Sequence, residues 1–324
     1  MRSADSIRNF DAALTARALN FEALIPALES MLLVGCEVPL RQTYEINGST
    51  TILIMPAWQS DGCLGVKTVT VVPSNCERGL PGLFSTYQLF DARSGVVLAN
   101  IDGNEITSRR TAAASALAAS RLAAPNARTL LLVGTGRVGS LLPAAYRIVR
   151  PIGRVLVWDR YDEVAVSFAR KLRGQGIEVE AVDNLKLACA EADIVCCATP
   201  STVPLIQGAW LRPGNHLDLI GSFKPEMRES DDACFAQAEV WIDTEEALTK
   251  TGDLLSPIKS GTISRSDVRG TLADPCHQPI QARDPGARTV FKAVGTGLAD
   301  LAAAMLVLRS QISDEPWPNR PYAN

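Results

Sequence analysis

Apolar and polar positions follow three different patterns along the 324 residues of the chain. Over residues 5–35 apolar side chains recur at helical spacing, which predicts a helical N-terminal segment. From RQTYEI to VVLANIDG, β-branched runs such as TILIMPAW and GCLGVKTVTVVP are separated by turn sequences such as QSDG and RSG. This pattern predicts several strands joined by turns in an antiparallel sheet. Residues 105–123 are rich in alanine and predict a helix.

From about residue 128, continuous apolar runs alternate with helix-like segments. The runs TLLLVG, RVLVWD, DIVCCAT and HLDLIG have no polar alternation, which is typical of parallel strands covered on both faces by helices. The segment TVFKAVGTGLADLAAAMLVLRSQI, residues 289–312, predicts one long C-terminal helix that returns to the first domain. The chain is therefore expected to be α/β, with a parallel-sheet domain inside a second, antiparallel one.

Composition and charge exclude several classes of function. The net charge is -3 and the sequence pI about 5.6, so neither nucleic acid nor an anionic membrane is an expected partner. There is no apolar run of the ~18 residues that span a bilayer, and the N-terminus lacks a signal-peptide core. We therefore expect a cytoplasmic protein. The eight cysteines form no C-x-x-C motif and there are two histidines, so no metal site is expected.

The hexapeptide GTGRVG, residues 134–139, follows the apolar run TLLLV and opens a helix-like segment. Its three glycines permit a tight turn, a close approach of the backbone to a pyrophosphate, and close packing of the helix against the strand. About twenty residues later the next strand ends in Asp159, where a carboxylate accepts hydrogen bonds from ribose hydroxyls. This context predicts a Rossmann domain. The expected cofactor contacts are Gly134, Thr135, Gly136, Arg137, Val138, Gly139, Asp159, Arg160, Thr199 and Ser222.

Two adjacent residues bear on the choice between the two nicotinamide cofactors. Asp159 would repel a 2′-phosphate, which favours NAD(H). Arg160 follows immediately and could bind that phosphate through a fork of donors, so NADP(H) stays open as the alternative. Thr199 lies in DIVCCATPST, where a fourth strand meets the nicotinamide side of a Rossmann site; it could equally cap a helix.

Motifs on both sides of the glycine-rich loop carry a family resemblance. VPLRQTYEI, GVKTVTVVPSNCERGLPG, DGNEITSRRTAAASALAA and FKAVGTGLADLAAA occur in this order. The series resembles the ornithine cyclodeaminase/mu-crystallin family over nearly the whole chain. The resemblance implies a homodimer with a central Rossmann domain, placed here at residues 121–294. It also implies a discontinuous substrate-binding and dimerisation domain, placed at residues 1–120 and 295–324.

Arg41, Lys67 and Arg110 stand where this family places its substrate-binding cations. An α-imino or α-amino acid presents a carboxylate, which a guanidinium can hold in a two-bonded fork. Lys67 can add a second charge and act as a proton donor to the reacting nitrogen. The resemblance therefore implies that these three residues form the catalytic site. Arg109, next to Arg110, is expected to be structural.

The family includes cyclodeaminases and reductases, and some residues separate them. By this resemblance, cyclodeaminases have an acidic residue at the position where this chain has Leu53. They have a threonine at the position where it has Gly82. They also have an Asp in a loop that reads Gly-Ser-Phe-Lys-Pro-Glu-Met here, so that Phe223 replaces the carboxylate and Met227 a lysine. A distal ammonium would lack its counter-charge, which is costly in a dry pocket. Asp218 and Glu226 remain as substitutes for the missing acid.

These residues predict an NAD(P)H-dependent reductase of a cyclic imino acid. Its substrate would be Δ1-pyrroline-2-carboxylate or Δ1-piperideine-2-carboxylate, and its product L-proline or L-pipecolate. Three alternatives remain open. They are an ornithine cyclodeaminase, an amino-acid dehydrogenase of the alanine type, and a mu-crystallin-like protein that binds a nucleotide or another ligand without catalysis.

Overall fold

The computed structural model describes residues 7–174, 176–278, 284 and 286–310. The chain forms two compact units. Unit 1 comprises Met1–Arg110 and Thr296–Asn324, and unit 2 comprises Thr111–Gly295. Their boundary falls inside the long helix α3 (Gly103–Leu122), whereas the sequence placed it at residue 120. The last residues assigned to the first domain, 311–324, lie outside the part that is described.

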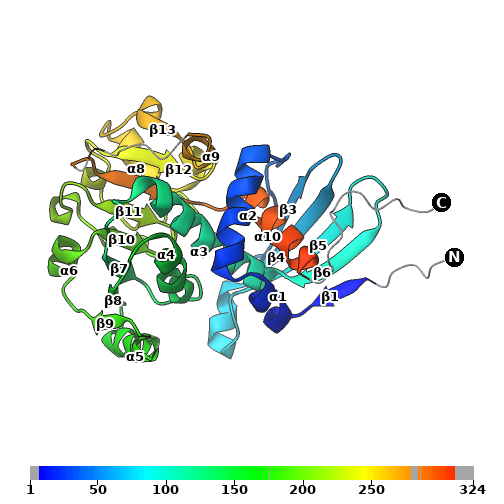
Figure 1. Cartoon of the computed structure of the whole chain (residues 1–324), viewed down its shortest axis with the longest axis horizontal. Helices are drawn as coiled ribbons and strands as arrows, with labels where there is room; N and C mark the ends of the chain where they lie inside the picture. Colours follow the sequence, from blue (N-terminus) through cyan, green and yellow to red (C-terminus); the bar gives the residue numbers. More distant parts are fainter. Residues whose placement is uncertain (1–6, 175, 279–283, 285, 311–324) are drawn as a thin grey trace. The chain divides into compact units, whose positions relative to one another are not determined.

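Unit 1 is built on a six-stranded sheet of order β1-β6-β5-β4-β3-β2. Strands β2 to β6 are antiparallel, as predicted, and β1 is added parallel to β6. Helix α10 packs on one face of this sheet, and α2 packs against α10 (Figure 1). The elements are β1 (Arg8–Phe10), α1 (Ala12–Ala18), α2 (Phe21–Val34), β2 (Gln42–Asn47), β3 (Thr50–Trp58), β4 (Cys63–Val71), β5 (Leu83–Asp91), β6 (Val97–Asp102) and α10 (Gly297–Arg309).

The N-terminal segment that was expected to be helical over 5–35 is helical in α1 and α2, but the expectation was wrong at Arg8–Phe10, which form β1. A strand comes first, and two helices follow it because the side chains of Asp11 and Asn20 each accept a hydrogen bond from a backbone N–H three residues on. Such N-caps start a new helix and interrupt the periodic apolar pattern. Residues 5 and 6 lie outside the described part of the chain.

Unit 2 contains an eight-stranded parallel sheet of order β13-β12-β14-β11-β10-β7-β8-β9. The order reverses between β7 and β10, which is the switch point of a Rossmann sheet. The Rossmann prediction is confirmed. The elements are β7 (Thr129–Val133), α4 (Leu142–Val149), β8 (Arg154–Trp158), α5 (Asp162–Arg173), β9 (Glu178–Ala181), α6 (Leu185–Glu191), β10 (Ile194–Cys197), β11 (His216–Leu219), β12 (Glu239–Ile242), α7 (Ala247–Lys250), α8 (Gly252–Lys259), β13 (Val268–Thr271), α9 (Ala273–Cys276) and β14 (Thr289–Lys292).

The predicted C-terminal helix was wrong over its first part. Residues Thr289–Lys292 form β14, in the middle of the parallel sheet, and the helix begins only at Gly297. The β-branched and aromatic run TVF favours a strand. Gly295, with a φ of 83°, and the N-cap Thr296 then separate this strand from α10. Strands β12 and β13 were not predicted from the sequence.

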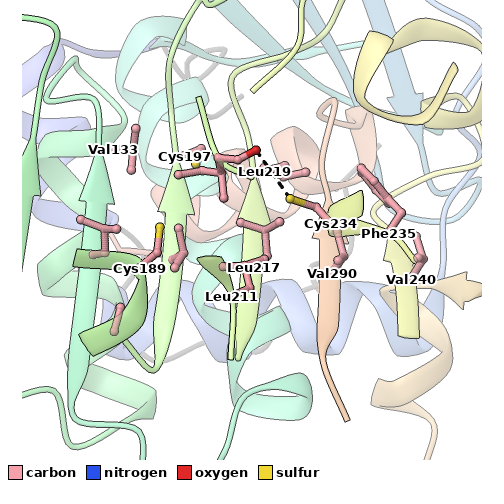
Figure 2. Close-up of a cluster of buried hydrophobic side chains, with 14 of the residues drawn as sticks. Val133, Cys189, Cys197, Leu211, Leu217, Leu219, Cys234, Phe235, Val240 and Val290 are labelled. Carbon is pink, nitrogen blue, oxygen red and sulfur yellow. Dashed lines mark hydrogen bonds between the residues drawn. The ribbon is translucent and has the colours of Figure 1, made fainter. Parts of the chain in front are cut away.

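The apolar interior of unit 2 explains its continuous hydrophobic runs. Val133, Cys197, Leu217, Leu219 and Val290 project from the parallel strands into one buried cluster (Figure 2). Cys189, Cys197 and Cys234 belong to this cluster as small buried side chains, and burial raises the pKa of all three thiols. The seven cysteines whose side chains the structure describes are free. Among the described residues, no helix is long and apolar enough to cross a membrane.

Candidate functional site

The three cations that the sequence singled out lie in unit 1, and two of them meet on one carboxylate. Nζ of Lys67 lies 2.6 Å from Oδ2 of Asp300, and the Nε–H of Arg110 donates to Oδ1 of the same residue at 2.8 Å. All three side chains are buried. Lys67 comes from β4, Arg110 from α3 and Asp300 from the first turn of α10.

The local sequence explains why Lys67 points inward. Alternate residues of β4 are buried, and Lys67 lies between Cys63, Gly65 and Val69 in that series. It pairs across the sheet with Met55 of β3 on one side and Tyr87 of β5 on the other. The alternation that buries apolar residues on this face therefore buries the lysine with them.

The charges in this cluster do not balance. Lys67 and Arg110 carry two positive charges and Asp300 one negative charge, which leaves a net charge of +1 among three buried groups. Arg41 lies close enough for its charge to lower the pKa of Lys67 further. A buried excess of positive charge favours an anionic ligand. Because Nε of Arg110 is held by Asp300, its two terminal amino groups can receive a carboxylate.

Burial also controls protonation in the cluster. Desolvation lowers the pKa of Lys67 to about 8, against the opposing charge of Asp300. Burial alone would raise the pKa of Asp300, but the charges of Lys67 and Arg110 outweigh it and hold that pKa below its ordinary value. Lys67 is therefore an ammonium near neutral pH and can give up a proton more readily than an exposed lysine.

Arg109 makes separate contacts. Its Nε–H donates to Glu105 one turn earlier in α3 at 2.9 Å, and its guanidinium reaches the carbonyl of Leu19 at 3.4 Å. These contacts support the structural role expected for Arg109. Asp300 was not singled out from the sequence, although it is the one carboxylate in the apolar helix segment LADLAAAMLVL.

The glycine-rich loop of unit 2 follows β7 at the carboxyl end of the parallel sheet. Gly134 has a φ of 95°, and a Cβ at Gly139 would collide with the carbonyl of Gly134, so the turn is too tight for a side chain there. A Cβ at Gly136, in contrast, would meet nothing within 4 Å. The loop thus keeps an open backbone face, which fits a dinucleotide pyrophosphate. Arg137 is exposed, Val138 is half-buried, and a short 3-10 turn at Gly139–Leu141 precedes α4.

Asp159 lies at the end of β8, where a ribose-binding acid is expected, and contacts the glycine-rich loop. Its Oδ2 accepts hydrogen bonds from the backbone N–H and the hydroxyl of Thr135, at 3.0 and 2.7 Å. Arg160 is exposed, and its guanidinium lies 5.9 Å from the centre of the Tyr161 ring. The acid is therefore fixed next to the loop.

Thr199 and Ser222 follow β10 and β11, and both are buried. The hydroxyl of Ser222 donates to the carbonyl of Met227 at 2.5 Å and lies 2.6 Å from the hydroxyl of Thr251. Its side chain is thus occupied within unit 2. The hydroxyl of Thr199 donates to Glu229, which was not singled out from the sequence. Asp218 and Glu226 were considered as replacements for the missing cyclodeaminase carboxylate. Asp218 is buried and accepts hydrogen bonds from Tyr146 and Cys196, whereas Glu226 is exposed.

In the described ranges no group of three or more His, Cys, Asp or Glu side chains is arranged to hold a metal ion. The fold, the glycine-rich loop and the buried cations together define a class of protein with two units. One is a Rossmann dinucleotide-binding unit, and the other carries buried cations suited to an organic acid. Comparisons with known proteins define it further. Residues 27–315 match the model of the ornithine cyclodeaminase/mu-crystallin family, and the chain belongs to that family.

Its relatives include named reductases. The chain is 41% identical over 262 residues to Δ1-pyrroline-2-carboxylate reductase of Paracoccus denitrificans, covering 80% of this chain and 83% of that protein. It is 35% identical to the enzyme of the same name from Colwellia psychrerythraea, covering 90% and 95%. The structure of Thermococcus litoralis Δ1-pyrroline-2-carboxylate reductase with NADH and L-proline has a TM-score of 0.88 at 28% identity, covering 94% and 97%. The prediction of an NAD(P)-dependent oxidoreductase is confirmed.

Proposed function

We propose that this chain is an NADH-dependent reductase of a cyclic imino acid, either Δ1-pyrroline-2-carboxylate or Δ1-piperideine-2-carboxylate. The observation that carries the proposal is the pair of buried cations, Lys67 and Arg110, on a single carboxylate. The relatives named above support the reductase branch. When bound, the reduced nicotinamide supplies the hydride for the C=N carbon.

The residues of the chain have three tasks in this reaction. Arg110, with Arg41, holds the substrate carboxylate through charge-assisted hydrogen bonds. Lys67, whose pKa burial lowers to about 8, adds a positive charge and gives a proton to the imine nitrogen. Asp300 fixes Nε of Arg110 and Nζ of Lys67 in place, so that neither cation has to be ordered by the substrate.

The loop after β11 favours a reductase over a cyclodeaminase. Phe223 is 49% exposed in this loop, where a cyclodeaminase is expected to have a carboxylate. An aromatic side chain suits an uncharged carbon ring, whereas a distal ammonium would remain unpaired. Asp159 supports NADH over NADPH, because a carboxylate next to the ribose repels a 2′-phosphate.

A substrate panel tests the proposal directly. Purified protein is incubated with each ring imine and with either NADH or NADPH, and oxidation of the cofactor is followed by absorbance. We expect turnover of a ring imine, faster with NADH. Ammonia release from ornithine would establish the cyclodeaminase, and pyruvate with ammonia giving alanine would establish the dehydrogenase. If the protein binds the nucleotide but turns over no 2-imino acid, it is a ligand-binding protein and the reductase proposal is rejected.

We propose further that the protein is a homodimer joined through the outer face of the unit 1 sheet. Tyr44, Ile52, Thr70 and Phe84 pair in one row across β2, β3, β4 and β5, on the face opposite Lys67. Tyr44 is 50% and Phe84 44% exposed. Large aromatic side chains exposed on one face of a sheet can mark a protein interaction surface, and a second copy of the same face would cover them.

Light scattering after gel filtration tests the dimer. The mass in solution is expected to be twice the 34.7 kDa of the chain. Phe84→Glu is expected to give a monomer, because it places a charge in the apolar interface. A monomeric parent protein, or an unchanged mass in the variant, would contradict this interface.

We also propose a cytoplasmic location, which the free thiols of the seven described cysteines support.

A further inference from the structure

Three ionisable side chains of unit 2 lie close together where no solvent reaches them. Glu229, Asp253 and Lys292 are all fully buried. Nζ of Lys292, at the end of β14, lies 3.1 Å from Oδ2 of Asp253 and 4.0 Å from Oε2 of Glu229. Asp253 also accepts hydrogen bonds from the backbone N–H groups of Glu229 and Ser230. Buried charges are costly even when paired, so their presence needs a reason beyond stability.

The carboxylate of Glu229 joins two loops at the carboxyl end of the parallel sheet. Its Oε1 accepts from the N–H and the hydroxyl of Thr199, at 2.7 and 2.9 Å, just after β10. Its Oε2 accepts from the N–H of Gly221 at 2.7 Å and of Ser222 at 3.3 Å, just after β11. An ionised carboxylate can accept on both oxygens, whereas an amide of the same size has one acceptor oxygen and two donor hydrogens.

The segment after β10 also packs tightly, both against the loop after β11 and against the glycine-rich loop. A Cβ at Gly221 would collide with the backbone of Thr199. A Cβ at Gly134 would lie 2.7 Å from Cγ2 of Thr199 and 2.9 Å from the carbonyl oxygen of Ala198. The Thr199 segment is thus packed between the loop that follows β7 and the loop that follows β11. A shift of Thr199 would disturb both neighbours, because neither has room to adjust.

We propose that Glu229 is a positioning residue of the cofactor site, which joins the segments after β10 and β11 and so keeps Thr199 packed against the glycine-rich loop in the arrangement that binds the dinucleotide. This inference rests on the proposed function, since it takes unit 2 as the NADH-binding unit. Two neighbours help to hold Glu229 in place. Lys292 places a positive charge near its carboxylate, and Asp253 accepts a hydrogen bond from its backbone N–H.

The test compares Glu229→Gln with Asp218→Asn. Both remove a buried carboxylate of unit 2, but Asp218 contacts Tyr146 and Cys196 rather than the loops. Lys292 keeps Asp253 as its nearest partner in the first variant. We measure the dissociation constant of NADH by its fluorescence. In the cofactor-free protein we also measure amide hydrogen exchange over residues 198–202 and 220–223. Glu229→Gln is expected to weaken NADH binding about tenfold or more and to speed exchange in both segments, because buried N–H donors lose their acceptor.

Asp218→Asn is expected to leave the dissociation constant and the exchange of these two segments unchanged. If Glu229→Gln does not fold, Glu229→Asp keeps the charge but is too short to reach both loops, and it is expected to weaken binding in the same direction. Equal NADH affinity and equal exchange in the parent and the Glu229 variant would overturn the inference, and so would an equal loss in Asp218→Asn. A parent protein that binds no NADH would overturn the proposed function instead, while exchange in the cofactor-free protein would still test whether Glu229 holds the loops.

Discussion

Lys67→Met is expected to lower kcat/KM for the ring imine by about 10²- to 10⁴-fold, the usual contribution of a positioned proton donor. The methionine keeps a similar volume, so the β4 position between Met55 and Tyr87 stays filled. Asp300 retains Arg110 as its partner. NADH affinity is expected to be unchanged, because the glycine-rich loop belongs to the other unit. Steady-state kinetics and NADH fluorescence measure the two quantities separately.

The pH dependence of the parent enzyme gives a second measurement of the same group. Burial lowers the pKa of Lys67 to about 8, and the protonated form is the one that donates. The rate constant kcat/KM is therefore expected to fall as the pH rises through about 8. In Lys67→Arg this fall is expected to disappear, since a guanidinium stays charged at that pH. The exposed Lys171 serves as a control, because Lys171→Met should change neither the rate nor its pH profile. Full activity in Lys67→Met would reject the assigned role.

Asp300→Ala is expected to lower the free energy of unfolding by about 3–5 kcal/mol, the usual cost of removing one partner from a buried ion pair. Asp300 is the carboxylate shared by Lys67 and Arg110, so its loss leaves two buried cations without their counter-charge. The pKa of Lys67 is expected to fall further, because the charge that opposes its desolvation is gone. Chemical unfolding followed by fluorescence measures the change.

Glu105→Ala provides a matched control for this substitution. Glu105 pairs with Arg109 in the same unit, but both side chains of that pair are partly exposed. The expected loss is about 0–1 kcal/mol, because solvent screens an exposed pair. A similarly small loss of unfolding free energy for Asp300→Ala would show that other groups neutralise Lys67 and Arg110. In that case the excess positive charge inferred for the cluster would be wrong.

The amino-acid sequence by itself determined the class of the fold and the position of the dinucleotide site. Continuous apolar runs separated by helices specify a parallel sheet, and the GTGRVG loop after β7 marks the carboxyl end of its first strand. Both signals are local, since they depend on residues close together in the chain. Local signals also predicted strands β2 to β6 of unit 1. They failed at residues 8–10, which form a strand, and at 289–292, where a β-branched and aromatic run favours a strand over a helix.

Only the tertiary structure decided which charges are partners. Lys67, Arg110 and Asp300 are far apart in the chain and meet because α10 packs on the sheet that contains β4. Glu229, which belongs to no helix or strand, reaches Thr199 and Gly221 because β10 and β11 are adjacent parallel strands. A sequence shows that such residues can be charged, but burial and distance decide whether they act together, and both arise only when distant segments pack.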